Sequence, residues 1–433
     1  MMKIIQIAAV PILAALCAWA HGQNIPAVTG PSNSQGFQLP TIPGDVTFGL
    51  SASEAVRTGY TGSGGTIFST ALYGDAALLS KSETHPFSMI FDGGYLFTSS
   101  SGQPSSPFLN LSLSQVLTTK NWNFVVSDSV RYLPESPVSG LSGLSGLGNL
   151  GIPTGIVNQG PLSLFGQRIT NTTTASIDRK LTASTDLQLA GSYDFLRFLG
   201  NNTGGFDYNS VSAQAGVSHR INAISSGGGH YSFSQFKYPV GRFSFKSHSI
   251  NVDYSRHFNR RLFMDASAGP QITSSTSQPS PNLSNPPIHN TTVNYTANVS
   301  FDYLFEKASA NLTYFRGVRS GAGVFQGTMA DTVSAGYNRS IGELTNVTAI
   351  ASFVDSRNIP GITTNLYSAH TYLLDVQGSR AIGRYLSAHA SYSILDQSVT
   401  RQAATSIPTA FNGFSQVITI GITYSPRPFH FGH

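Results

Sequence analysis

The chain has 433 residues, of which only 10% are charged, and its formal net charge is +5. An average soluble domain is about 25% charged, so a water-facing surface this poor in charge would be badly solvated. The positive charges form no basic run, which argues against nucleic acid as a partner. The composition fits a protein whose exterior faces lipid and whose interior is polar but largely neutral.

Residues 1–22 have the pattern of a secretory signal peptide. Lys3 precedes the apolar segment IIQIAAVPILAALCAWA, which ends in an A-x-A site, so we expect cleavage after Ala20 or after Gly22. A lipid anchor on Cys17, the single cysteine, is the alternative, but the Leu before it is not the usual Gly or Ala of a lipoprotein. Residues 23–43, with four prolines, are expected to form an extended periplasmic leader.

From residue 44 onward the dominant pattern is two-residue alternation. In NTTVNYTANVSFDYLFE the apolar side chains from Val293 to Phe305 share one face, and Asn, Thr, Ser and Asp share the other. Such runs are longer than the usual strand of about five or six residues and suit a tilted strand that crosses a bilayer. No later segment is apolar for long enough to form a membrane-spanning helix.

The pattern predicts about eighteen strands. In chain order they lie at 44–57, 67–80, 86–99, 107–119, 121–132, 167–179, 184–198, 206–219, 223–236, 242–258, 261–274, 290–305, 308–319, 327–340, 344–356, 366–380, 385–398 and 412–425. Short connections alternate with long ones rich in Gly, Pro, Ser and Asn, as in an antiparallel up-and-down transmembrane β-barrel. The first two strands and the ninth have a weak pattern, so sixteen strands is the alternative.

Residues 44–433 are therefore predicted to be one all-β barrel, and over 44–425 the chain resembles porin-like outer-membrane β-barrels of Gram-negative bacteria. The segment FSQVITIGITYSPRPFHF is similar to the aromatic final strand of that class, although Gly432 and His433 follow Phe431 where a terminal Phe is usual. The resemblance implies a bacterial outer-membrane location, contact with outer-membrane lipid and insertion by the barrel-assembly machinery. A homotrimer is expected only by analogy with porins.

Enzymatic and metal sites find little support in the residues. No G-x-S-x-G elbow is present, and no HxH or HxxxH pair lies on one strand face, so we expect no catalysis, no metal site and no cofactor. Arg220, Arg260 and Arg261 lie near predicted periplasmic turns, where anchoring at the membrane interface accounts for them.

The polar strand faces are the better place to look for function. Residues predicted to line the lumen are Asp92, Ser112, Ser114, Asn294, Asn298, Asp302, Thr348, Ser352, Asp375, Ser391 and Thr419. A wall of hydroxyls and amides suits small, mainly neutral hydrophilic solutes such as sugars, which would cross by passive diffusion. The alternatives are a barrel that exports a polysaccharide or another polymer, and a structural or adhesive surface barrel.

The longest connection, 133–166, contains the uncharged stretch SGLSGLSGLGNLGIPTG from Ser139 to Gly155. It would be the third outer loop, and in porins the third loop commonly folds into the lumen and narrows it. By that resemblance the constriction residues are expected to be Glu135, Leu141, Leu144, Leu147 and Leu150. With Glu135 as the one acidic member, such a constriction would select solutes by width more than by charge.

Overall fold

The structure is a computed structural model that describes residues 45–59, 65–80, 85–99, 105–133, 167–199, 206–239, 243–277, 287–321, 325–359, 368–400, 412–427 and 429–430. The predicted signal peptide and leader, the cleavage residues Ala20 and Gly22, and the predicted constriction residues from Glu135 to Leu150 lie outside these ranges. Among the residues that the structure describes, no helix is long and apolar enough to cross a membrane.

Eighteen long strands form the structure, and a nineteenth, very short strand follows them. Their bounds are β1 (Asp45–Thr58), β2 (Ile67–Leu79), β3 (Phe87–Thr98), β4 (Ser106–Thr118), β5 (Trp122–Leu133), β6 (Arg168–Lys180), β7 (Thr185–Phe198), β8 (Tyr208–Arg220), β9 (Ser225–Tyr238), β10 (Phe243–His257), β11 (Leu262–Ser277), β12 (Ile288–Leu304), β13 (Ala308–Arg319), β14 (Thr328–Ile341), β15 (Thr345–Asn358), β16 (Ser368–Ala381), β17 (Leu386–Val399), β18 (Gly413–Tyr424) and β19 (Phe429–His430). Each predicted strand end lies within three residues of the observed end.

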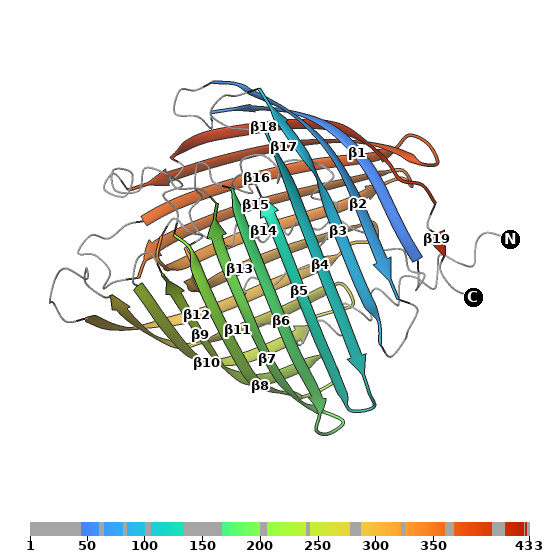
Figure 1. Ribbon diagram of the computed structural model, residues 1–433. Helices are drawn as coiled ribbons and strands as arrows, with labels where there is room; N and C mark the ends of the chain where they lie inside the picture. The colour runs from blue at the N-terminus through green and yellow to red at the C-terminus, as the bar shows by residue number, and fades with distance from the viewer. Residues whose placement is uncertain are drawn as a thin grey trace.

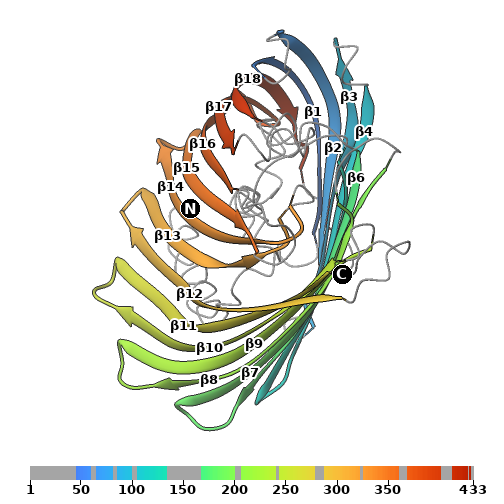
Figure 2. The same cartoon turned by 90° about the vertical axis from the view of Figure 1, so that its left-hand side faces the viewer.

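The sheet closes on itself. Every long strand pairs antiparallel with the next one in the chain, and β1 also pairs with β18, in the register that sets Ser51 opposite Thr423. The two residues of β19 extend the pairing at the start of β1. Figure 2 shows the strands arranged as a ring. The prediction of an antiparallel up-and-down barrel with eighteen strands is confirmed, and sixteen strands is wrong, because β1, β2 and β9 pair along their whole lengths.

The connections differ between the two ends of the barrel. Tight turns join β4 to β5, β6 to β7, β8 to β9 and β10 to β11, and β1 begins and β18 ends at the same end (Figure 1). We call this the short-turn end and the other the long-connection end. One connection at the long-connection end is also short, since β9 ends at Tyr238 and β10 begins at Phe243.

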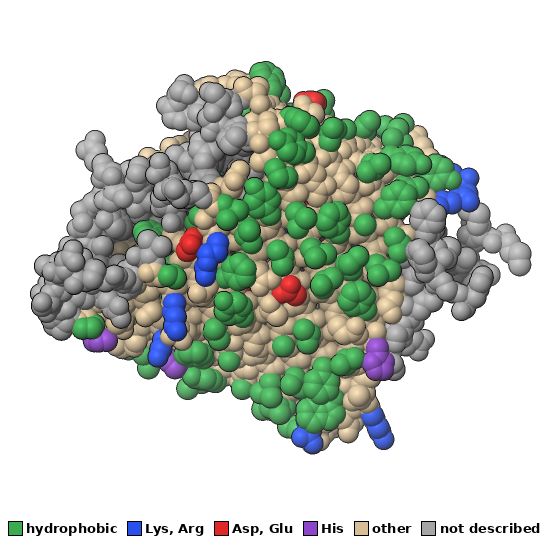
Figure 3. Space-filling view, viewed as in Figure 1, with side chains coloured by type: hydrophobic (Ala, Val, Ile, Leu, Met, Phe, Trp, Pro, Cys, Tyr) green, Lys and Arg blue, Asp and Glu red, His purple; other side chains and the backbone are tan. Residues whose placement is uncertain are grey.

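The two faces of the wall differ in polarity. Outward positions carry exposed apolar side chains, among them Leu50, Ile250, Val293 and Ile418, which are 53–73% exposed. Most of the buried polar residues, which are chiefly Ser, Thr, Asn and Gln, alternate with them and point inward. In Figure 3 hydrophobic side chains are spread over much of one outer face, and only a few charged side chains lie among them. An apolar exterior band around a polar interior is the arrangement of a transmembrane barrel.

The β10–β11 ladder contains one local irregularity. Its pairing passes from Ser249 opposite Gln271 directly to Val252 opposite Ala268, although the register is unchanged. Gly269 and Pro270 lie in this gap, where Pro270 has no N–H to donate. A Cβ on Gly269 would collide with the backbone carbonyl of Ile250, so the two strands approach closely there.

Candidate functional site

The inner wall of the barrel is the candidate site. The strand registers place all eleven predicted lumen residues on inward positions, and Asp92, Ser352, Ser391 and Thr419 are among the buried polar residues. The eleven do not form one cluster, because they are distributed over β3, β4, β12, β15, β16, β17 and β18. Their role as contacts for a solute stays a prediction.

Inward polar side chains bind one another across neighbouring strands. Asn110 on β4 donates from Nδ2 to Asp92 Oδ1 at 2.7 Å and accepts at Oδ1 from Arg131 Nε at 3.2 Å. On another part of the wall, Thr371 Oγ1 donates to Gln397 Oε1 at 3.0 Å, and Ser393 donates to Asp375. These links hold the polar groups in fixed positions along the inner surface.

Positive and negative residues on the inner wall are separated along the barrel axis. Arg57, Arg131, Arg168 and Arg319 face inward within two residues of a strand end at the long-connection end. The inward aspartates lie mostly within six residues of the short-turn end: Asp75, Asp92, Asp178, Asp186, Asp253, Asp265, Asp302 and Asp375. Asp194 lies closer to the long-connection end, and Lys180 and Arg220 add positive charge at the short-turn end.

Sequence reasoning did not single out these four arginines. Each lies where the alternating pattern ends and a connection begins, so the face to which it belongs depends on a register that only strand pairing defines. Their position beside the Gly- and Pro-rich connections was the one available signal.

A cavity of about 340 Å³ opens in the inner wall toward the short-turn end, between β7 and β11. Its lining is polar and includes Asp186, Gln214, His230, Asp253 and Asp265. Gly228 on β9 belongs to the same lining and faces inward without a side chain. This is a hydrogen-bonding hollow in the path along the lumen.

His230 is held in place at this cavity by two neighbours. Its Nδ1 lies 2.7 Å from Asp253 Oδ2, and Asn251 Nδ2 lies 2.9 Å from its Nε2. Because the amide donates to Nε2, the imidazole carries its proton on Nδ1 and donates it to Asp253. The buried acceptors Asp253 Oδ1 and Gln214 Oε1 have no hydrogen-bond donor among the described residues. Both residues belong to the lining of the cavity.

Aromatic side chains narrow the lumen toward the long-connection end. Tyr238, Phe243 and Phe245 on β9 and β10 form a buried cluster with Ile359, which follows β15 on another part of the ring. Tyr238 Oη donates to the carbonyl oxygen of Ser320 at 2.6 Å, just after β13. The cluster therefore connects two parts of the wall. It is a constriction built from residues that the sequence analysis did not select.

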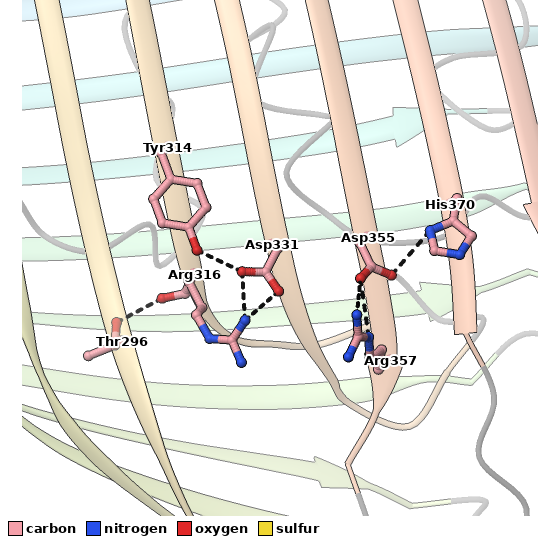
Figure 4. A network of polar contacts seen from close by, with 7 residues as sticks. All are labelled: Thr296, Tyr314, Arg316, Asp331, Asp355, Arg357 and His370. Atoms are coloured by element: carbon pink, nitrogen blue, oxygen red, sulfur yellow. Dashed lines mark hydrogen bonds and ion pairs between the residues drawn. The ribbon is translucent and has the colours of Figure 1, made fainter.

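A second polar network lies outside the lumen. Figure 4 shows it on β12 to β16, where the registers place Arg316, Asp331, Asp355, Arg357 and His370 on outward positions. Arg316 Nη1 donates to both carboxylate oxygens of Asp331, at 2.8 and 2.6 Å, and Arg357 Nη2 lies 2.6 Å from Asp355 Oδ2. This network belongs to the exterior toward the long-connection end.

The described residues contain no group of three or more His, Cys, Asp or Glu that could hold a metal ion. What the geometry defines is a closed antiparallel barrel with an even number of long strands, an apolar exterior and a polar inner wall. Because the sheet is closed, every strand has a hydrogen-bonded neighbour on both sides, so the backbone polar groups can be paired inside a bilayer. The protein is a β-barrel of the bacterial outer membrane.

No family model matches the chain, and no curated protein matches its sequence. Among solved structures, it is similar to the ferric citrate transporter FecA in its unliganded form, with a TM-score of 0.45, 11% identity and coverage of 89% of this chain and 65% of that one. It is also similar to OpdQ of Pseudomonas aeruginosa, with a TM-score of 0.43, 12% identity and coverage of 89% and 99%. A third is the alcaligin outer-membrane receptor FauA of Bordetella pertussis, with a TM-score of 0.41, 10% identity and coverage of 87% and 76%.

Proposed function

We propose that the protein is a channel through which small, mainly neutral hydrophilic solutes such as sugars diffuse passively across the outer membrane. The observation that carries the proposal is the polar inner wall, on which hydroxyl and amide side chains recur from β1 around to β18. A wall of this kind keeps a lumen wet and offers hydrogen bonds that are individually weak enough to release a solute.

The wall cavity between β7 and β11 supports a sugar as the solute. The carboxylate of Asp253 and the amide of Gln214 in the lining suit hydroxyl donors, while Ser218, Ser226 and Arg220 in the same lining offer donors. A sugar presents both donors and acceptors on every ring. Its size also suits a hollow of about 340 Å³.

Conductance across a planar bilayer tests the proposal. We expect the refolded barrel to insert and give steady single-channel steps, and we expect a neutral disaccharide to reduce the current. Asp253→Asn weakens the acceptor that faces the cavity, so it should reduce blockade by the disaccharide several-fold while leaving the open conductance close to that of the natural protein.

The matched control is Asp375→Asn. That carboxylate also faces inward, but it accepts from Ser393 on a part of the wall away from the cavity. The disaccharide should block the current through this variant as strongly as through the natural protein. A barrel that is correctly folded by circular dichroism but forms no conducting pore would refute the channel, and equal blockade in both variants would refute the role of the cavity.

A further inference from the structure

We propose that the exterior of β7 to β12, at its long-connection end, binds the phosphate group of a membrane lipid. The binding surface is formed by Arg197, Lys237, Lys246 and His248, which we call the basic rim, with His289 at its margin. This inference concerns the outside of the barrel and does not depend on what passes through the lumen.

The register places the basic rim on one continuous outer surface. Lys237 lies opposite Ser244 on β10, and Lys246 lies opposite Gln235 on β9, so the two lysines are diagonal neighbours. Both are exposed, whereas Tyr238 and Phe245, next to them in the chain, are buried toward the lumen. The lysines therefore point outward.

Arg197 and His248 extend this surface to both sides. Arg197 on β7 donates from Nη2 to Asn209 Oδ1 at 2.6 Å, and Asn209 lies opposite Lys237. His248 follows Lys246 at the next outward position of β10, where its Nδ1 lies 2.7 Å from Tyr231 Oη. The four basic groups thus span four adjacent strands, a width of about 15 Å at the usual spacing.

The charge of the basic rim is not neutralised locally. None of the outward positions on β7 to β12 is Asp or Glu. Within the described residues, Lys237 and Lys246 have no ion-pair partner, and the partners of Arg197 are carbonyl and amide oxygens. The nearest acidic residues along the chain, Asp194 and Asp253, face the lumen, and Asp207 Oδ1 accepts from the backbone N–H of Phe198.

The outward network on β13 to β16 makes the contrast clear. There the cations Arg316 and Arg357 each contact an aspartate on the same outer surface. Both arginines are therefore paired within the protein, and neither needs an external anion as its partner. The basic rim also lies near the long-connection end but lacks the carboxylates.

Below the basic rim the wall is apolar. Ile250 and Val252 occupy the next outward positions of β10 toward the short-turn end and are 64% and 71% exposed, and Ile272 lies opposite His248. A phospholipid is arranged in a matching way, with a charged phosphate group above apolar acyl chains. Lysines near a membrane surface attract anionic headgroups, so the arrangement fits a phosphorylated lipid oriented along the wall.

The test is lipid retention by the complete, refolded barrel. The protein is exchanged into vesicles of phosphatidylcholine with about one-tenth phosphatidic acid, extracted in mild detergent and analysed for bound lipid by native mass spectrometry. We expect phosphatidic acid to be enriched on the natural protein. Lys237→Gln combined with Lys246→Gln should reduce its apparent affinity by about fivefold for each lysine.

The matched control is Arg256→Gln, which removes an outward positive charge from β10 near the short-turn end. It should retain phosphatidic acid like the natural protein. Unchanged retention in the double variant, or an equal loss in the control, would overturn the proposal. Displacement of the lipid by millimolar inorganic phosphate would also overturn it, since the ligand would then be a free anion and not a lipid.

Discussion

Asp331 and Asp355 lie directly opposite each other on β14 and β15, facing outward. Two carboxylates in this position would repel each other, yet each has its own cation, Arg316 for the first and Arg357 for the second. Tyr314 Oη also donates to Asp331 at 2.8 Å, and the guanidinium carbon of Arg316 lies 4.3 Å from the centre of the Tyr295 ring. The arrangement converts a repulsive pair into two adjacent ion pairs.

The two arginines are expected to differ in their effect on stability. The Arg316 side chain is 22% exposed and that of Arg357 is 67% exposed. Arg316→Gln leaves the partly buried carboxylate of Asp331 without its cation and removes the contact with Tyr295, so we expect a loss of about 1–3 kcal/mol in the free energy of unfolding. Urea unfolding of the barrel from lipid vesicles measures this loss.

Arg357→Gln is the comparison for that experiment. The Arg357 guanidinium is largely solvated, and the Asp355 carboxylate, which is 11% exposed, also has His370 Nδ1 at 3.3 Å, so removal of Arg357 should cost less than removal of Arg316. Equal losses for the two variants would show that the exposure of the arginine does not set the strength of these pairs.

Among the strands, β11 comes very close to the backbone of β10 at Gly269. A methyl group there would meet the carbonyl oxygen of Ile250 on β10, and the backbone would have to shift because Pro270 already limits the local ladder. We expect Gly269→Ala to lower the free energy of unfolding by about 1–3 kcal/mol, measured in the same vesicles.

Gly378→Ala on β16 provides the matched control. A Cβ at Gly378 would lie 3.9 Å from the carbonyl oxygen of Asn346, which is an ordinary contact. This variant should unfold close to the natural midpoint. A Gly269→Ala barrel as stable as the Gly378→Ala barrel would contradict the close approach of β10 and β11.

The strands were predictable because their signals are local. Alternation and turn residues are contained in about fifteen consecutive residues, and the predicted ends of the eighteen strands differ from the observed ends by at most three residues. Even β9, whose pattern is weakened by Gly227 to Gly229, was predicted at 223–236, within two residues of its observed ends.

The constriction and the cavity were not predictable in the same way. Tyr238, Phe243 and Phe245 are aromatic residues that point into the lumen, whereas an alternating pattern assigns apolar side chains to the lipid face. Their partner Ile359 is more than a hundred residues distant, so no local pattern connects them. The same holds for His230 and Asp253, whose contact depends on the β9–β10 register.

For the whole molecule, the separation of inward arginines from inward aspartates predicts an electrically asymmetric pore. Positive charge gathers near the long-connection end and negative charge toward the short-turn end. We expect the single-channel current in about 0.1 M KCl to differ between positive and negative voltages. In about 1 M KCl the Debye length falls to about 3 Å, so the asymmetry should largely disappear.

Measuring both salt concentrations on the same inserted channel checks this expectation. Equal currents at both polarities in dilute salt would mean that the ions do not experience the two charge zones. An asymmetry that is unchanged in concentrated salt would point to the shape of the lumen, and not to its charge, as the cause.

The pairing of β1 with β18 has a consequence for biogenesis. The hydroxyls of Ser51 and Thr423 lie 2.8 Å apart although 372 residues separate them in the chain, whereas every other pair of long strands joins chain neighbours. Hairpins can therefore form one after another as the polypeptide emerges, but the ring cannot be sealed until its final strand arrives. Until that moment β1 presents an open hydrogen-bonding edge, and a polypeptide that stops short of β18 would be left as an unclosed sheet with two such edges, a ready template for aggregation.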